Sequence, residues 1–270
     1  MGIPTMERIK YTFERTRAHG RIALMPYLPV GYPSVETTLA LAPALVEAGA
    51  DLFELGVPYS DPQADGATIQ HATHQALQSG VTPRVCLDVA AKMRRAVDVP
   101  LLFMSYYNPI AHFGNAAFCQ AAAEAGVDGL IVPDLPREEA DDLRDAARGH
   151  HLDLIFMVAP TSTDERLRIV AEVASGFMYC VALSGVTGAR SQLASGLGEY
   201  LDRVRRATEL PLAVGFGISR PEPVREVARP ADGAIVASAL VDRLDKLAPE
   251  DRVSGAAAYV RELAAATGRE

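Results

Sequence analysis

The feature that most constrains the fold of this chain is a regular alternation of short apolar runs with longer amphipathic segments. Each apolar run has about the length of a buried strand, and most runs lack the polar alternation of a half-exposed strand. Runs of this kind predict strands that are covered on both faces. We count eight of them, at Ile22–Leu28, Leu52–Gly56, Leu101–Met104, Gly129–Val132, Leu154–Val158, Met178–Leu183, Leu212–Gly215 and Ala234–Ala237.

Helical patterns separate these runs. Parallel neighbouring strands need such crossovers, so the alternation predicts a parallel sheet in an α/β fold. Eight units in about 250 residues predict a (β/α)8 (TIM) barrel, formed as one domain over residues 1–270. The clearest helical patterns are Val35–Ala48, Thr82–Val97, Asn115–Ala125, Arg137–Arg148, Asp164–Val173 and Pro221–Ala228, the last with a proline at a suitable first helical position.

Two further features concern the ends of these units. Met1–His19 is charged and helical in pattern, and we expect it to form an extra N-terminal helix that closes the bottom of the barrel. An aspartate precedes three of the apolar runs, at Asp51, Asp128 and Asp232. Each stands two residues after a Gly or Pro, which suits the end of a helix and a short turn into the next strand.

The composition excludes several classes of function. A net charge of −8 argues against DNA or RNA as a partner, because phosphate backbones select basic surfaces. No apolar run reaches the roughly 18 residues of a membrane span, and the amino terminus lacks the apolar region of a signal peptide. The three cysteines, Cys86, Cys119 and Cys180, are far apart and odd in number, which indicates reduced, buried thiols. We therefore expect a cytoplasmic protein with no membrane and no nucleic-acid partner.

Glu54 is the most conspicuous candidate for chemistry, because it interrupts an otherwise apolar run between Phe53 and Leu55. Barrel enzymes place their sites at the carboxyl ends of strands, where this residue falls. A buried carboxylate is costly unless it is paired or protonated, and burial raises its pKa toward the range of an acid or base near neutral pH. The alternative is a structural glutamate that is paired with an arginine or capped by backbone.

Two aspartates follow in the loop Val57–Gly66, and the residues alone do not separate them. Asp61 precedes Pro62 and is able to shape a turn. Asp65 precedes Gly66 and suits a turn or the start of a helix. Either is a candidate second carboxylate.

Later runs end in glycine-rich stretches. Residues 184–190 have the pattern of a loop that closes over substrate, or of an ordinary loop between a strand and a helix. Gly217 and Ser238 follow the seventh and eighth runs, where barrels bind phosphate through N–H groups and a hydroxyl at a helix start. Gly215-x-Gly217 does not complete a dinucleotide fingerprint, because position 220 is Arg220.

We expect no metal site. His71 and His74 lie three residues apart on a helical pattern, but no third ligand stands nearby in the sequence. A surface helix explains both of them.

At this point a set of motifs, in one order from about residue 22 to 241, resembles the tryptophan synthase α chain family. The longest is Leu55-Gly56-Val57-Pro58-Tyr59-Ser60-Asp61-Pro62-Gln63-Ala64-Asp65-Gly66, with Ile69-Gln70 beyond it. The others are Met25-Pro26-Tyr27 with Gly31-Tyr32-Pro33, Tyr106-Tyr107-Asn108-Pro109, Pro133-Asp134-Leu135-Pro136, Gly185-Val186-Thr187-Gly188 and Gly215-Phe216-Gly217-Ile218.

The resemblance implies roles for particular residues. Glu54 and Asp65 match the family's two catalytic carboxylates. The indole pocket maps onto Tyr27, Met104, Ile131, Tyr179, Thr187 and Phe216. The phosphate site maps onto Gly188, Gly217, Ala237 and Ser238, with Ala237 standing where the family usually has glycine. Contact with a β chain maps onto Pro58, Asp61, Asn108, Asp134 and Pro136.

The reaction that the resemblance implies is a retro-aldol cleavage of indole-3-glycerol phosphate to indole and glyceraldehyde 3-phosphate, in tryptophan biosynthesis. Glu54 would protonate indole C3 and then remove the glycerol hydroxyl proton, while Asp65 would accept the indole N–H. Indole would pass to the β subunit of an α2β2 heterotetramer. We expect no cofactor in this chain, and pyridoxal phosphate only in the β partner.

Three other interpretations remain open. A stand-alone indole-producing lyase would use the same residues without a β chain. A non-catalytic regulatory subunit would not need both carboxylates, the closing loop and the phosphate glycines. A phosphate-binding barrel isomerase would explain Gly217 and Ser238 but not the long motif from Leu55 to Gly66.

Overall fold

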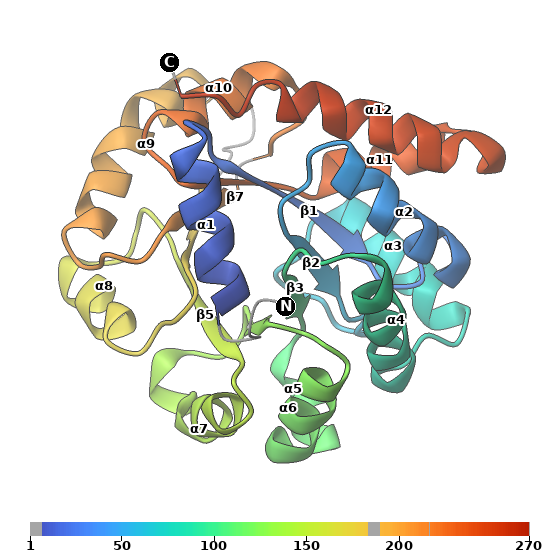
Figure 1. The fold of residues 1–270 in the computed structure, drawn as a ribbon. Coiled ribbons are helices and arrows are strands. Elements are labelled where there is room, and N and C mark those ends of the chain that lie inside the picture. Colours follow the sequence, from blue (N-terminus) through green and yellow to red (C-terminus); the bar gives the residue numbers. More distant parts are fainter. Residues whose placement is uncertain (1–6, 183–189, 216, 270) are drawn as a thin grey trace.

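The computed structural model describes residues 7–182, 190–215 and 217–269, with no side chains described for 190–195. Eight parallel strands pair in sequence order and β8 pairs with β1, which closes the barrel (Figure 1). The predicted barrel is confirmed, and the predicted runs match the strands to within two residues. The strands are β1 Ala23–Pro29, β2 Phe53–Gly56, β3 Leu101–Met104, β4 Gly129–Ile131, β5 Asp153–Val158, β6 Met178–Val181, β7 Leu212–Gly215 and β8 Gly233–Val236.

Helices form a ring around the strands (Figure 1). Three of them begin at a side-chain cap, where Ser34, Thr82 and Thr163 accept N–H bonds from Thr37, Val85 and Arg166. The helices are α1 Arg8–Ala18, α2 Val35–Glu47, α3 Ala67–Gln78, α4 Pro83–Ala96, α5 Tyr107–Phe113, α6 Asn115–Glu124, α7 Asp141–Gly149, α8 Asp164–Ala171, α9 Arg190–Arg205, α10 Pro221–Ala228, α11 Ser238–Lys246 and α12 Arg252–Ala264, with short 3-10 turns at η2 Arg137–Glu139 and η3 Pro249–Asp251.

One predicted helix is divided. The pattern over Arg137–Arg148 predicts a single helix, whereas the chain makes the 3-10 turn η2 and begins α7 at Asp141. The turn is closed by i to i+3 bonds from Glu139 N–H to the Pro136 carbonyl, 3.0 Å, and from Ala140 N–H to the Arg137 carbonyl, 3.2 Å. The tighter winding prevents a continuous α-helix across Ala140.

The strands carry two cores, one on each face. Leu24, Leu28 and Leu55 belong to the outer core between the strands and the helices. Ala23, Met25 and Ile155 belong to the inner core that fills the barrel. Both sets are buried, which explains why the apolar runs lack polar alternation. The polar Glu54 is therefore exceptional among the buried strand residues.

The N-terminal helix closes one end of the barrel, as predicted. Ile9 and Phe13 of α1 join the inner core, and the Phe13 ring packs against Phe177 with 5.6 Å between centroids. In Figure 1, α1 crosses the end of the barrel in dark blue. This plug excludes water from the end opposite to the one where a barrel site forms.

A repeated hydrogen bond joins neighbouring strands at the plugged end. A side chain placed just before each even-numbered strand accepts the backbone N–H near the start of the odd-numbered strand before it. The repeat explains the aspartates that precede the apolar runs, and Ser175 takes their place once. The four bonds are Leu24 N–H to Asp51, 3.0 Å, Leu101 N–H to Asp128, 2.9 Å, Leu154 N–H to Ser175, 3.0 Å, and Leu212 N–H to Asp232, 3.0 Å.

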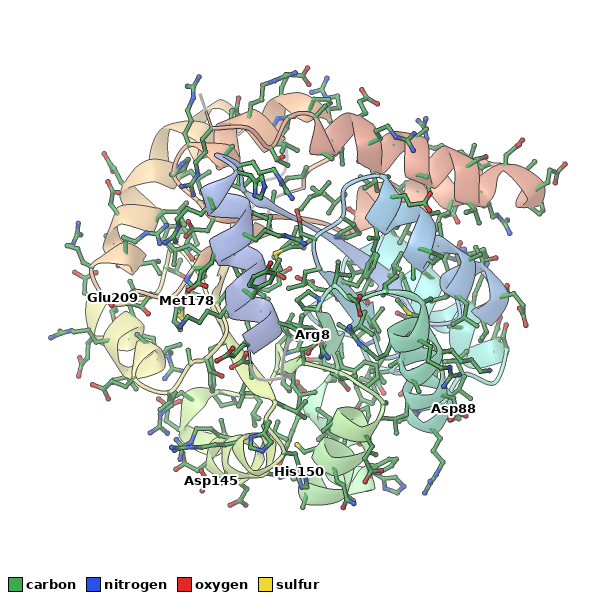
Figure 2. All side chains as sticks on the ribbon, in the orientation of Figure 1. Arg8, Asp88, Asp145, His150, Met178 and Glu209 are labelled. Atoms are coloured by element: carbon green, nitrogen blue, oxygen red, sulfur yellow. The ribbon has the colours of Figure 1, made fainter. Side chains whose placement is uncertain are left out.

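The same three aspartates hold α1 in place. Arg8 lies 2.6 Å from Asp128, as measured between Nη1 and Oδ1, and Figure 2 labels Arg8 at the start of α1. Arg15 of α1 pairs with Asp51 at 3.0 Å. The Asp128 side chain is fully buried and also pairs with Arg94 at 3.2 Å. Each aspartate thus satisfies a strand N–H and at least one arginine together.

We expect Asp128→Ala to destabilise the barrel. Removal of the carboxylate leaves Arg8 and Arg94 without their buried counterion, which costs about 3–5 kcal/mol in the free energy of unfolding. Urea denaturation followed by circular dichroism measures the change. The control is Asp145→Ala, since that side chain is 72% exposed in its pair with Arg144 and lies at the periphery of α7 (Figure 2). The control is expected to cost less than about 1 kcal/mol, and equal losses in both variants would contradict this account.

Candidate active site

A cavity of about 210 Å³ opens at the carboxyl ends of the strands. Residues from every strand except β4, from the start of α3 and from the segments that follow β7 and β8 meet there. The sequence-predicted residues in its wall are Tyr27, Glu54, Asp65, Met104, Tyr179, Gly217, Ala237 and Ser238. A larger cavity, about 390 Å³, lies near the start of β5 and holds none of the predicted residues.

Glu54 is the buried acid of this cavity. Its residue is 1% exposed, and within the described part of the chain its Oε1 atom has no hydrogen-bond partner. The structural alternative, a glutamate held by arginine or backbone, would satisfy that atom. Burial alone raises the pKa of Glu54 to about 8, so the side chain is mostly protonated at neutral pH.

Asp65 has a different environment from that of Glu54. It ends the turn that begins at Pro62, with its N–H bonded to the Pro62 carbonyl at 3.1 Å, and it directly precedes Gly66, which caps α3. The side chain is half-buried in the cavity wall. Burial raises the pKa of Asp65 to about 6, and a hydrogen bond from the Tyr106 hydroxyl lowers it in part. Asp65 is therefore mostly ionised at pH 7.

The structure separates the two aspartates that local sequence left tied and that the family resemblance had distinguished. Asp61 is exposed, accepts a hydrogen bond from its neighbour Ser60 at 2.5 Å, and does not line the cavity. Asp65 does line it, together with Glu54. The cavity therefore contains one buried, protonated carboxyl group and one half-buried, ionised carboxylate.

Two tyrosines form flat walls beside these carboxyl groups. Tyr27 and Tyr179 are 6% and 8% exposed, and burial raises the pKa of each well above its usual range, so both are neutral. Glycines make room for their rings. A Cβ at Gly215 would lie 2.9 Å from the Tyr179 hydroxyl, and one at Gly56 would overlap the Tyr27 ring. A cavity wall with two aromatic rings suits a flat apolar ring.

The far end of the cavity is formed by Gly217, Ala237 and the start of α11 at Ser238. Helix N-termini carry unpaired N–H groups and a partial positive charge, which suit phosphate. Gly217 has a φ of +38°, which favours glycine, and no atom lies within 4 Å of the place where a Cβ would be. An anion is therefore able to approach this backbone closely.

Not every predicted residue takes part in this cavity. Ile131 lies in the inner core, fully buried, and is not in the cavity wall. Thr187, Gly188 and Phe216 lie outside the described residues. Sequence reasoning missed several apolar wall residues. Two of them, Met157 and Val181, sit two positions after an inner-core residue on their strand, so period-two alternation was a usable signal. The missed apolar residues are Ile69, Met157, Val181, Ile218 and Ile235.

The described residues contain no group of three or more His, Cys, Asp or Glu side chains arranged to hold a metal ion. His71 and His74 are exposed on α3 and contact Gln75 and Gln78, each at 3.0 Å. Within the described ranges, no helix is both long and apolar enough to cross a membrane.

The residues predicted to meet a β chain surround the ends of β2, β3 and β4. Pro58 and Asn108 line a broad cavity of about 610 Å³, together with Leu77, Arg84 and Phe113. Asp134 accepts the N–H of Tyr107 at 2.9 Å, and Pro136 is exposed before η2. The predicted contact residues Pro58, Asp61, Asn108, Asp134 and Pro136 thus follow the carboxyl ends of three adjacent strands.

Comparisons with known proteins agree on one family. The family model for the tryptophan synthase alpha chain matches residues 13–267. The tryptophan synthase alpha chain of Chloroflexus aggregans is 58% identical over 265 residues, which is 98% of this chain and 99% of that one. That of a Roseiflexus species is 56% identical over 259 residues, covering 96% and 99%.

Solved structures give the same result. A chain of Mycobacterium tuberculosis tryptophan synthase superimposes with a TM-score of 0.88 at 42% identity, covering 96% of this chain and 98% of that one. Tryptophan synthase subunit alpha from Legionella pneumophila gives 0.89 at 36% identity, covering 96% and 98%. The chain belongs to the tryptophan synthase alpha chain family.

Proposed function

We propose that Glu54 and Asp65 are the catalytic pair with which this chain cleaves indole-3-glycerol phosphate. The cleavage yields indole and glyceraldehyde 3-phosphate and is the activity of the family, so the chain is a lyase of tryptophan biosynthesis. One observation supports the assignment above all others. Two carboxyl groups share one cavity, and their surroundings place the pKa of Glu54 near 8 and that of Asp65 near 6.

The bond to be broken joins C3 of the indole ring to the first glycerol carbon. It breaks only if the ring accepts the electron pair, and protonation of C3 turns the ring into such an acceptor. Glu54 supplies that proton, since its carboxyl group is protonated at neutral pH. The resulting carboxylate then takes the proton of the glycerol hydroxyl, the C–C bond breaks, and its electrons restore the aromatic ring. Glu54 ends protonated, as it began.

Asp65 acts on the opposite side of the ring. Protonation at C3 places positive charge on the ring nitrogen, and an ionised carboxylate that accepts the N–H stabilises that charge. Asp65 is ionised at pH 7, because its side chain is only half-buried and receives a hydrogen bond from Tyr106. The two carboxyl groups therefore need no exchange of roles during the reaction.

The remaining walls hold the substrate. Tyr27, Met104 and Tyr179 enclose the indole ring, and Gly217 with Ser238 at the start of α11 binds the phosphate. The methyl group of Ala237 occupies space beside that phosphate. These steps use protein side chains and substrate alone, and we propose pyridoxal phosphate only for the β partner.

We expect Glu54→Gln and Asp65→Asn each to abolish indole formation. Loss of a general acid and base costs about 10²–10⁴ in rate, and loss of an electrostatic partner for the transition state costs about 10²–10³. A spectrophotometric indole assay measures both. Near-normal turnover in either variant would contradict the assignment.

Stability controls accompany that test. A carboxyl group whose pKa is raised on folding destabilises the fold increasingly as the pH rises from about 4.5 toward 8. Glutamine removes this cost, so Glu54→Gln is expected to melt no lower than the parent chain at pH 8. Thermal denaturation checks that inactivity does not come from unfolding.

The pH dependence of kcat/KM is expected to be bell-shaped. Activity falls as the pH drops through about 6, where Asp65 becomes protonated, and as it rises through about 8, where Glu54 loses its proton. Both limbs belong to the coupled pair of carboxyl groups. A profile that stays flat between pH 5 and pH 9 would be incompatible with these roles.

We further propose that the chain pairs with a β chain as an α2β2 heterotetramer, through Pro58, Asp61, Asn108, Asp134 and Pro136. Family membership implies a β partner, and the broad cavity beside Pro58 and Asn108 offers a surface next to the active-site loop. The loop that begins at Pro58 ends at Asp65, so a partner there is able to influence the catalytic carboxylate.

Asn108→Ala is expected to weaken that pairing. Asn108 is exposed and touches the broad cavity, so its loss should raise the β-chain concentration needed for half-maximal stimulation about tenfold. Indole turnover is measured with increasing β chain, and Asp145→Ala on α7 serves as the distant control. If β chain fails to stimulate the parent chain, a stand-alone lyase becomes the better interpretation.

A further inference from the structure

Tyr106 reaches the catalytic loop from the segment that follows β3, and in the steps above it neither binds substrate nor transfers a proton. Its hydroxyl oxygen accepts the N–H of Ala64 at 2.8 Å. Tyr106 and Asp65 also line one small cavity together, and a hydrogen bond from the Tyr106 hydroxyl lowers the pKa of the Asp65 carboxyl group. One side chain therefore binds the loop at Ala64 and lies beside the next residue, the proposed catalytic carboxylate.

The direction of these bonds follows from the atoms involved. A phenol has one proton to donate and lone pairs to accept with. Since the Ala64 N–H is a donor, the Tyr106 oxygen accepts there and keeps its own proton for the Asp65 carboxylate. A chain of this kind, from N–H to O–H to carboxylate, strengthens each of its bonds. The ionised form of Asp65 gains the most, because it is the better acceptor.

The Tyr106 ring is held rigidly enough to position a partner. It is 7% exposed and packs against the ring of Tyr59, with centroids 5.4 Å apart. Its carbonyl accepts the Ser105 hydroxyl at 2.9 Å, and the N–H of the next residue, Tyr107, is bound by Asp134 at 2.9 Å. The hydroxyl is thus fixed by β3 and its exit segment, while Asp65 lies on a turn.

We propose that Tyr106 is a positioning residue, which holds the Asp65 carboxylate toward the cavity for the indole N–H. The inference rests on the proposed role of Asp65. It adds the group that allows a half-buried carboxylate on a turn to keep one orientation and remain ionised at neutral pH.

The other groups around Asp65 do not provide this support. Glu54 faces it from β2, Tyr27 from β1 and Tyr179 from β6. Glu54 is mostly protonated at pH 7, because burial raises its pKa to about 8, and the two tyrosines, whose pKa burial raises further, are neutral. Asp134 is near Tyr106. Its negative charge repels a carboxylate and does not stabilise one. Among the described residues, Tyr106 is the group that lowers the pKa of Asp65.

The test is the pH profile of kcat/KM for Tyr106→Phe, in the indole assay with indole-3-glycerol phosphate. Without the hydroxyl, the ionised form of Asp65 loses its donor, and the acidic limb is expected to move up by about one pH unit. At pH 6 the variant should therefore retain about a tenth of its plateau kcat/KM, whereas the parent chain retains about half of its own. The alkaline limb, set by Glu54, should stay in place.

Tyr107→Phe is the matched control. It removes the neighbouring hydroxyl, which accepts a hydrogen bond from Asn115 at 3.1 Å and has no part in the Asp65 contact. The acidic limb of this control should coincide with that of the parent chain. A uniform loss of kcat/KM at every pH in Tyr106→Phe, with both limbs unmoved, would overturn the proposal, since that is the result of a merely structural role.

A second variant keeps the test independent of folding. Replacement of Tyr106 by 3-fluorotyrosine preserves the ring and the hydroxyl but makes the O–H a stronger donor, so the acidic limb should move to lower pH. An acidic limb that moves up or stays in place would count against the proposal.

Asp65→Asn separates the proposed catalytic role of Asp65 from the proposed positioning role of Tyr106. If it retains normal turnover, the proposed function fails, whereas if it is inactive while the Tyr106 variants leave the limb unmoved, only the positioning role fails.

Discussion

A parallel barrel closes only when every strand runs in the same direction, and this constraint brings all eight amino ends to one rim and all eight carboxyl ends to the other. In this chain the two rims have separate uses. The amino rim is closed by α1 and joined by Asp51, Asp128 and Asp232, which bind strand N–H groups and arginines. The carboxyl rim carries the cavity with Glu54 and Asp65. Stability and chemistry are thus placed at opposite ends of the same strands.

The burial of Glu54 shows how the requirements of stability and of chemistry meet in one residue. A carboxyl group with no partner for Oε1 in the described structure is a cost to folding at neutral pH. The same burial keeps the carboxyl group mostly protonated at neutral pH, as the proposed role of Glu54 requires. Such a group is tolerable because the rest of the barrel interior is closely packed and apolar. The ion pairs of the amino rim lie at the end of the barrel opposite to the cavity. Substitutions there therefore change the stability of the fold and do not touch the cavity.

Asp65 and Tyr106 show how a side chain from a rigid element supports a residue on a loop. Asp65 stands on a turn, where backbone alone gives a side chain little definition. Tyr106 comes from the exit of β3, a rigid part of the barrel. Its hydroxyl accepts the N–H of Ala64, and its side chain lines a small cavity with Asp65. This hydrogen bond thereby fixes the loop to the exit of a strand that is about 40 residues away in the sequence. The loop also begins at Pro58, beside the surface proposed for the partner chain.

Much of the fold and part of the candidate site could be predicted from the residues, because the signals are local in the sequence. Apolar runs and helical periods locate the strands, because a parallel barrel buries both faces of each strand. Glu54 is conspicuous because a charged residue interrupts such a run. The predicted helix over Arg137–Arg148 failed at Ala140, where a 3-10 turn depends on bonds that no period reveals.

Other features were decided only by the tertiary structure. Asp61 and Asp65 have similar neighbours in the sequence, and only the folded loop turns one outward and the other into the cavity. Ile131 and Met157 both face the barrel interior, yet depth along the strand puts the first in the core and the second in the cavity wall. The sequence by itself determined the order of strands and helices, and it made the carboxyl rim, with Glu54, the expected place of the chemistry. The pKa difference between the carboxyl groups, the arginine partners of the repeated aspartates and the reach of Tyr106 depend on distances between segments far apart in the chain, which only closure of the barrel sets.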